Sequence, residues 1–282
     1  MRSTALLVAL TLVVMMALPS ISVAAQAPVN LGTTSSFAVL AGTTITNSGA
    51  TTINGDAGGN VGIAPGSDFP GFADVTLTGA AHLADAVALQ AQNDLITAYD
   101  DAAGRTPFTT IPNELGGTTL KAGVYVSETG PFEITGTLTL DAEGDPNAVF
   151  IFKSASSLVT AAGSNVNLIN GARYCRIFWQ VTSSATLGAN SHFVGHLFAL
   201  TSIWVDTGAT IQGQLLAREG EVTLLGNTIM NGLCPTAATP TTSTVTGGEL
   251  PRTATPWYSL LLAGVALTLI GAMGWSTRRI HD

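Results

Sequence analysis

The sequence predicts a mainly β fold, an irregular three-sided β-solenoid (β-helix) with one long α-helix packed along it. Strand-like stretches recur around glycines on both sides of a single segment that has the apolar spacing of a helix. Only 10% of the 282 residues are charged, so Thr, Ser, Asn, Gly and Ala must form most of the surface. Small polar turns followed by short apolar runs suit stacked coils, because each coil buries its apolar side chains only against its neighbours.

Residues 1–25 have the layout of a secretory signal peptide. Arg2 precedes a long apolar stretch, and small residues close the segment. We place cleavage after Ala25, with Ala27 as the second possibility. The folded domain is then expected over residues 28–234.

The first strand repeats lie in "FAVLAGTTITNSGATTINGDAGGNVGIAPG". After them, residues 79–103 carry apolar side chains at helical spacing, with Gln92 on the opposite side. Gly104 is expected to end this helix. A helix of about 37 Å between two sets of strand repeats should lie lengthwise along the solenoid and cover one side.

Four stretches after the helix align on glycine, and a fifth, around Thr135 and Gly136, is a partial copy. The reference glycines are Gly163, Gly188, Gly208 and Gly226, at intervals of 25, 20 and 18 residues. An irregular period of this length indicates a solenoid. One coil then provides three sides of about five residues, the usual length of a strand, and the coils stack about 4.8 Å apart.

Cys175 and Cys234 are the only cysteines. In an exported domain a disulfide is expected, and two unpaired buried thiols are the alternative. Closing a loop of this length would stabilise the fold by roughly 4 kcal/mol in the chain-entropy model.

The end of the chain has the pattern of a surface anchor. Residues 235–249 form a Thr/Pro-rich stalk that cannot bury enough to fold, and residues 257–275 are an uncharged run long enough to cross a bilayer. Residues 276–282 form a basic tail expected in the cytoplasm. The domain is therefore expected outside the cell, held at the membrane or the cell wall.

Residues 250–254, LPRTA, resemble the LPxTG sorting signal that sortases process. The matching residues are Leu250, Pro251 and Thr253, and Ala254 stands where the usual signal has Gly. Sortase processing with cell-wall attachment is one expectation. A plain single-span membrane anchor is the other.

Four features together resemble the ice-binding protein family of bacteria, fungi and algae. They are "FAVLAGTTITNSGATTINGDAGGNVGI", the inserted helix, "IFWQVTSSATLG" and "GATIQGQLLAREGEVTLLGNTI". The resemblance covers about residues 30–232. It implies a discontinuous right-handed β-solenoid with three faces, N-terminal strands inserted out of sequential order, a parallel helix, and one flat face that binds an ice crystal surface.

The family's ice-face motif is Thr, then Ala or Gly, then any residue, then Thr or Asn, and residues 207–210, TGAT, match it fully. Residues 48–51, SGAT, match it with Ser in the first place. The resemblance therefore implies a set of ice-contacting residues in the turns and strands of the repeats. These are Ser48, Thr51, Thr160, Thr186, Asn190, Thr207, Ala209, Thr210 and Thr228.

Other classes of function have weaker support. Eighteen Asp and Glu against ten Lys and Arg leave no basic patch for nucleic acid. A polysaccharide lyase or hydrolase on a β-helix would need clustered carboxylates, but the acids here are dispersed. The stretch "DAEGD" resembles a polar turn more than a calcium loop, and His192 and His196 lack the helical context of a zinc motif. We expect a monomer with no catalytic residue, metal or cofactor. A surface adhesin or carbohydrate-binding module, with Trp204 exposed, is the alternative to ice binding.

Overall fold

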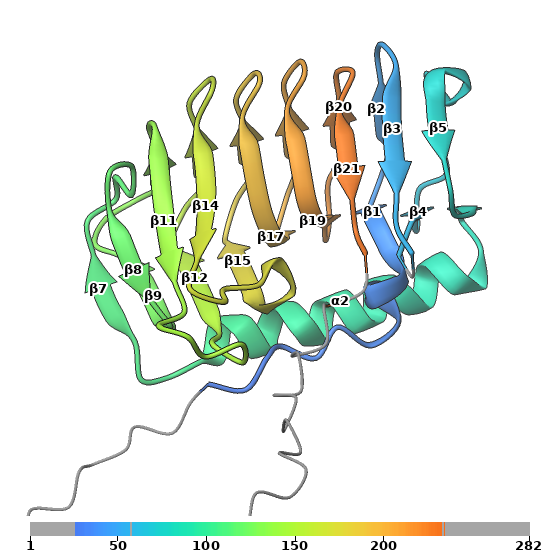
Figure 1. Cartoon of the computed structure of the whole chain (residues 1–282). Helices are drawn as coiled ribbons and strands as arrows, with labels where there is room; N and C mark the ends of the chain where they lie inside the picture. Colours follow the sequence, from blue (N-terminus) through green and yellow to red (C-terminus); the bar gives the residue numbers. More distant parts are fainter. Residues whose placement is uncertain (1–25, 57, 233, 235–282) are drawn as a thin grey trace, which may run out of the picture. The chain divides into compact units, whose positions relative to one another are not determined.

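The computed structural model describes residues 26–56, 58–232 and 234. Within these residues the strands pair in parallel, coil upon coil, and one long helix runs beside them (Figure 1). The predicted mainly β solenoid with a single long helix is confirmed. The predicted signal peptide, stalk, sorting-like motif, membrane span and basic tail lie outside the described residues. Among the described residues, no helix is both long and apolar enough to cross a membrane.

One side of the coils is a six-stranded parallel sheet, here called the six-stranded face. Its strands have three residues each, of which the middle one points outward and the flanking two point into the core. In spatial order they are β10 (Phe132–Ile134), β13 (Leu158–Thr160), β16 (Ala185–Leu187), β18 (Ile203–Val205), β20 (Val222–Leu224) and β2 (Ile45–Asn47).

A 15-stranded sheet forms the other two sides, because β17 and β19 turn a corner and belong to both. The corner falls at Gly195 and Gly213, which pair with φ of 116° and 143°. A Cβ on Gly213 would collide with the carbonyl oxygen of Gly195, so glycine is required there. One side contains β8 (Thr119–Lys121), β11 (Thr137–Asp141), β14 (Asn165–Ile169), β17 (His192–Ala199), β19 (Thr210–Ala217), β21 (Thr228–Met230), β3 (Thr51–Asn54) and β5 (Val75–Leu77).

The third side, here called the helix-covered face, is completed by the second halves of β17 and β19. Its other strands are β7 (Thr109–Ile111), β9 (Gly123–Ser127), β12 (Phe150–Ser154), β15 (Ile177–Val181), β1 (Phe37–Ala41), β4 (Asn60–Ile63) and β6 (Ala81–Leu83). All five residues of β1 and of β15 are buried. Strands buried on both surfaces read as continuous apolar runs, and here the core covers one surface and the helix the other.

The coils do not follow the order of the chain. The N-terminal strands stack on the C-terminal ones, since Val39 pairs with Leu215 and Thr52 with Thr228. The next strands, β4 to β6, finish that end of the stack. The chain then passes along the helix to β7 at the opposite end and winds back (Figure 1). This agrees with the out-of-order insertion that the family resemblance implies.

The helix α2 (Ala86–Gly104) is shorter at its start than predicted. Residues 79–85 are not helical: Ala81–Leu83 form β6, which pairs with β4, and the side chain of Asp85 caps the helix by accepting a hydrogen bond from the Ala88 N–H. Gln92 is also buried, contrary to prediction. Its Nε2 donates to the Ala217 carbonyl oxygen at 3.2 Å.

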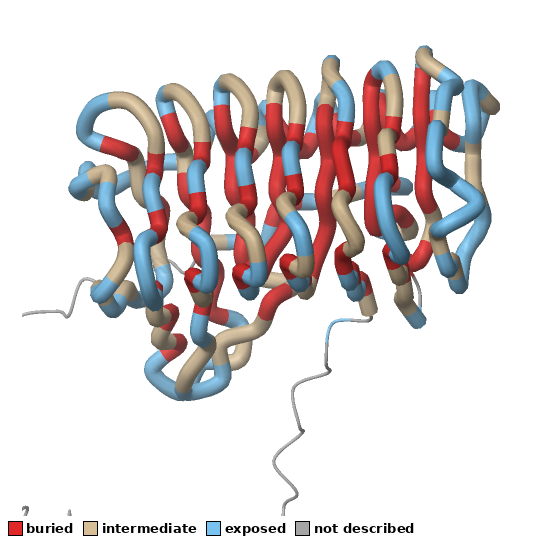
Figure 2. Tube along the Cα trace, turned by 90° about the horizontal axis from the view of Figure 1, so that it is seen from above, coloured by how far each residue is buried: buried red, intermediate tan, exposed pale blue. Residues whose placement is uncertain are grey.

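Two apolar layers hold the fold together. Inside the coils, the rings of Phe152 and Trp179 stack with centroids 4.0 Å apart. Between the sheet and the helix, Leu95 packs in a cluster with Phe178 and Leu216. Along the coils, buried residues alternate with exposed ones (Figure 2), as expected where one surface of a strand faces the core and the other faces solvent.

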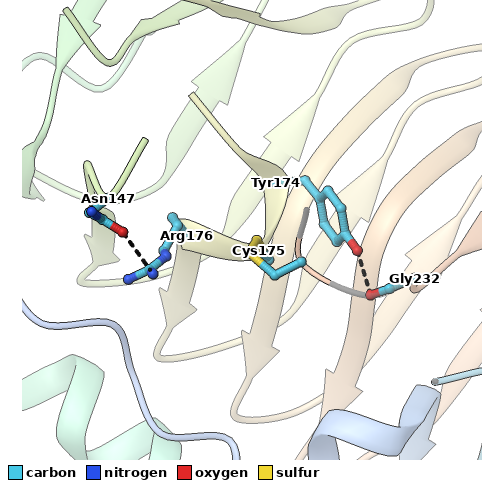
Figure 3. Close-up of a disulfide and its surroundings, with 6 residues drawn as sticks. Asn147, Tyr174, Cys175, Arg176 and Gly232 are labelled. Atoms are coloured by element: carbon cyan, nitrogen blue, oxygen red, sulfur yellow. Dashed lines mark hydrogen bonds between the residues drawn. A yellow bond between two sulfur atoms is a disulfide. The ribbon is translucent and has the colours of Figure 1, made fainter. Parts of the chain in front are cut away.

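In the described part of the chain, three short 3-10 helices connect the elements: η1 (Gly32–Ser36), η2 (Phe72–Asp74) and η3 (Tyr174–Arg176). The predicted disulfide is present between Cys175 of η3 and Cys234 (Figure 3). Beside it, the Tyr174 hydroxyl donates to the Gly232 carbonyl oxygen. Residues at the end of the domain are thus joined to the segment that precedes β15.

Candidate functional site: a threonine-lined face

One outward-pointing residue from each of seven neighbouring strands forms a row across the side that contains β3, β19 and β21. Each residue pairs directly with the next, so the register is unbroken across all of the strands. We call this row and the strands that carry it the threonine face. The row is Thr137, Asn165, His192, Thr210, Thr228, Thr52 and Thr76.

This row is accessible and carries no carboxylate, ammonium or guanidinium group. Asn165 and Thr52 are partly exposed and the others are exposed. Parallel strands lie about 4.8 Å apart, so successive hydroxyl and amide groups recur at that interval. His192 Nδ1 lies 2.9 Å from the Thr210 hydroxyl oxygen, within hydrogen-bond distance.

A second, less regular row lies two residues further along the same strands. It contains Asn167, Gln212 and Asn54, but also Met230, whose side chain is 48% exposed. The buried Val194 lies between Asn167 and Gln212 in strand order. The hydroxyl pattern is therefore most regular where each strand begins.

The turns that lead into these strands border the first row. Thr207, Asn190 and Ser48 are exposed in three of these turns, and the Asn190 N–H donates to the Thr207 carbonyl oxygen at 2.9 Å. Asn190 has φ of 55° and Gly208 has φ of 71°, so each takes the left-handed conformation that the turn needs. Thr210 and Thr228, which pair directly, complete the predicted residues that lie at this face.

Three residues predicted to contact ice are buried and cannot do so in this structure. Thr51 is 1% exposed, Thr160 is 4% exposed and Ala209 is fully buried. The Thr51 hydroxyl donates to Asn47 Oδ1 and accepts from the Asn227 N–H, and the Thr160 hydroxyl accepts from the Gly188 N–H. The buried hydroxyls of Thr51 and Thr160 are thus hydrogen-bonded at the corners of the coils, as buried polar groups usually are.

The glycine alignment of the sequence was wrong by two residues in one coil. The structure places Asn190, not Gly188, beside Gly208, and His192, not Asn190, beside Thr210. Asparagine tolerates the left-handed conformation better than most residues, so a glycine was not required there. The interval of 18 residues from His192 to Thr210, repeated from Thr210 to Thr228, was the signal that could have found the true register.

That register also identifies row members that the sequence reasoning missed. Thr52 follows the buried Thr51 and is the true partner of Thr228, and Thr76 continues the row into β5. Thr137, Asn165 and His192 extend it at the other end.

Thr186 lies elsewhere, on the six-stranded face. Its outward neighbours there are Val159, 40% exposed, and Trp204, 45% exposed. The exposed Glu133 occupies the end of the same row. This face is therefore more uneven in side-chain size than the threonine face, and it carries formal charge.

The residues considered for catalysis or metal binding do not converge. His192 is on the threonine face, whereas His196 is buried at 3% exposure on the helix-covered face. In the turn at residues 141–145, Asp141 accepts from the Glu143 N–H and from Asn170, and these bonds hold the pKa of Asp141 below its usual value. Among the described residues, no group of three or more His, Cys, Asp or Glu side chains could hold a metal ion.

Known proteins with related sequences support the same assignment of the fold. A family model described as ice-binding-like matches residues 39–230. An ice-binding protein of Nostoc sp. (strain HG1) is 42% identical over 203 residues, which cover 71% of this chain and 73% of that protein. Ice-binding protein 1 of Shewanella frigidimarina is 34% identical over 78% of this chain, but the match spans only 27% of that longer protein.

Solved structures of ice-binding proteins have a similar fold. The crystal structure of an ice-binding protein from an Antarctic biological consortium superimposes with a TM-score of 0.71 and 43% sequence identity, covering 76% of this chain and 95% of that one. The parallel coils, the inserted helix and the extent of the sequence match together show that this chain belongs to the ice-binding-like family.

Proposed function

We propose that this protein adsorbs to ice through the threonine face and thereby inhibits ice growth or recrystallisation. The observation that carries the proposal is the unbroken register of the first row, from Thr137 to Thr76, on a side other than the one that helix α2 covers. Membership of a family whose relatives are named ice-binding proteins supports it.

The proposed mechanism requires no reaction. Each threonine offers a hydroxyl that anchors a water molecule and a methyl group that excludes liquid water. Because the side chain is β-branched, few rotamers are lost when it docks. Rows repeating at about 4.8 Å lie close to a repeat of the ice lattice, so waters ordered on the row can join the crystal. Charged side chains would hold their own hydration shells and disturb this order.

We place the edge of the contact at the exposed turns. Thr207, Asn190 and Ser48 border the row and extend the array of hydroxyl and amide groups. The other two sides fit the role less well. Helix α2 covers one, and on the other the large apolar side chains of Trp204 and Val159 are exposed and Glu133 pairs with Val159.

Replacing Thr210 with tyrosine tests the proposal. Thr210 lies in the middle of the row, so a bulky ring there would hold the ice surface away from neighbouring residues. We expect the thermal hysteresis of the purified full chain to fall severalfold, with recrystallisation inhibition reduced in parallel. Circular dichroism should be unchanged, since Thr210 is exposed.

Thr186→Tyr is the matched control, because Thr186 is also an exposed threonine at the outward position of a short strand, but on the six-stranded face. It should retain wild-type activity. Loss of activity in Thr186→Tyr with no loss in Thr210→Tyr would move the ice site to the six-stranded face. No thermal hysteresis in the wild-type chain at high micromolar concentration would remove the ice assignment altogether.

We also propose that the domain is exported and anchored at the cell surface. The sequence of residues 1–25 and 250–282 is the support. Contacts of Gln26 and Ala27 with the folded domain favour cleavage after Ala25. Gln26 Nε2 donates to the Thr106 carbonyl oxygen at 3.2 Å, and Arg105 donates to the Ala27 carbonyl oxygen at 2.7 Å. The intact mass of the exported chain tests this, and a mature chain that begins at Pro28 would contradict it.

A further inference from the structure

Trp204 lies in the middle of the six-stranded face with its indole ring in solvent. Ile203 and Val205 beside it in β18 are buried, so Trp204 must point outward, and it is 45% exposed. Thr186 and Thr223 pair with it from the two neighbouring strands. A tryptophan left this accessible forgoes much of the free energy that its burial would provide.

Two carboxylates lie near Trp204 along the chain and across the sheet. The partly exposed Asp206 follows β18 directly, two residues after Trp204, and the exposed Glu221 precedes β20, where its carbonyl oxygen accepts from the Ile203 N–H at 2.9 Å. None of the outward residues of the six strands is Lys or Arg. They are Glu133, Val159, Thr186, Trp204, Thr223 and Thr46, of which Thr223 is buried.

These features select the chemistry of the occupant. Carboxylates without nearby cations would repel an anionic polymer. The large exposed apolar residues of this face are Val159 and Trp204, and they lie on strands separated by β16. Two separated side chains form no continuous apolar patch, whereas a stable protein interface buries roughly 800 Å² per partner. An aromatic ring among hydroxyl and carboxylate acceptors fits a sugar, which presents C–H groups on its ring face and hydroxyls around its edge.

We propose that the six-stranded face binds an uncharged polysaccharide, with Trp204 stacked on a pyranose ring. The carboxylates of Asp206 and Glu221 accept hydrogen bonds from the hydroxyls of the same or adjacent sugar units, and the Thr186 hydroxyl donates or accepts one. The strand spacing of about 4.8 Å is close to the length of one pyranose along a chain, so a polymer that runs across the strands meets one outward side chain per sugar. The site is independent of the threonine face, and the protein can hold ice and an extracellular polymer together.

Affinity electrophoresis of the purified full chain tests this proposal. Native gels would contain laminarin or dextran as uncharged probes, or alginate as an anionic one. We expect slower migration in at least one uncharged gel and no retardation in alginate. Trp204→Ala should weaken the retardation by about tenfold, whereas Trp204→Tyr, which keeps an aromatic ring, should retain part of it.

Leu89→Ala is the control, because Leu89 is a comparably exposed apolar residue on helix α2. It should migrate as the wild type does, and Trp204→Ala should keep its thermal hysteresis and its circular dichroism spectrum. Wild-type migration unaffected by every uncharged probe, or retardation that persists unchanged in Trp204→Ala, would overturn the proposal. Loss of thermal hysteresis in Trp204→Ala would show instead that this face contacts ice.

Discussion

His196 is a buried side chain on the helix-covered face, next to the disulfide-bearing helix η3. Its ring stacks on Phe178 with centroids 5.2 Å apart, and it is 3% exposed. Burial disfavours the imidazolium ion and lowers the pKa of His196 to about 4, against an ordinary value of 6.5. The folded state therefore holds this histidine neutral at pH values where the unfolded chain protonates it.

This difference makes the free energy of unfolding depend on pH. Between pH 6.5 and pH 4 the unfolded state binds more protons at this site, so stability falls as the pH falls. At 1.36 kcal/mol per pKa unit, the loss approaches about 3 kcal/mol. Urea unfolding at pH 7 and pH 4 would measure it.

His196→Leu removes the titrating group and serves as the comparison for that measurement. Carboxylates contribute their own acid sensitivity to both proteins, so the quantity to examine is the difference between them. We expect the variant to lose less stability than the wild type over this pH range. Equal losses would show that His196 is not held neutral.

The sequence predicted some residues of the first row of the threonine face, such as Thr210, and missed others because the coils were aligned on glycine. Glycine was used to align the coils, but the left-handed position is filled by Asn190 in one coil and by Gly208 in the next. The adjacent threonines Thr51 and Thr52 differ only in which way the strand turns them, and that is set by pairing with Thr228. A slip of one residue exchanges the buried and exposed sides of a strand, so exact register was needed to identify the face.

Among the elements, helix α2 depends on a narrow apolar stripe. Leu95 is fully buried in the cluster with Phe37, Phe178 and Leu216. Leu95→Ala should therefore leave a cavity and lower the free energy of unfolding by about 2–5 kcal/mol. Leu89→Ala makes the same chemical change on the same helix at a residue that is 53% exposed, and it should cost less than about 0.5 kcal/mol. Similar destabilisation by both would contradict the packing of this helix.

The start of that helix shows where sequence periodicity fails. Ala80 and Leu83 fit a helical pattern, yet Leu83 belongs to β6 and pairs with Ile63 in β4. A short apolar run suits a strand or a helix equally well, and only the tertiary partner decides between them. Asp85 was the local signal for the true boundary, because Asp is a preferred N-cap residue.

For the domain as a whole, the repeats predicted the coils but could not predict their order in space. Nothing near Val39 in the sequence indicates that it pairs with Leu215, because such contacts join segments that are distant along the chain. The discontinuous order came from the family resemblance. The position of the helix followed more simply, since a long helix between two sets of strands has to cross the stack from one end to the other.

The disulfide acts at this largest scale, because it joins Cys175 and Cys234 across a separation of 59 residues. The closed loop includes the strands from β15 to β21, on which the N-terminal coils stack. In the chain-entropy model a loop of this length stabilises the folded state by about 4 kcal/mol. Reduction should therefore shift the urea midpoint of the full chain to a lower concentration, with ice-binding activity retained below the transition. The Cys175→Ala/Cys234→Ala variant should have the same urea midpoint as the reduced wild type, with or without reductant. If reductant left the wild-type midpoint unchanged, the disulfide would contribute little to stability.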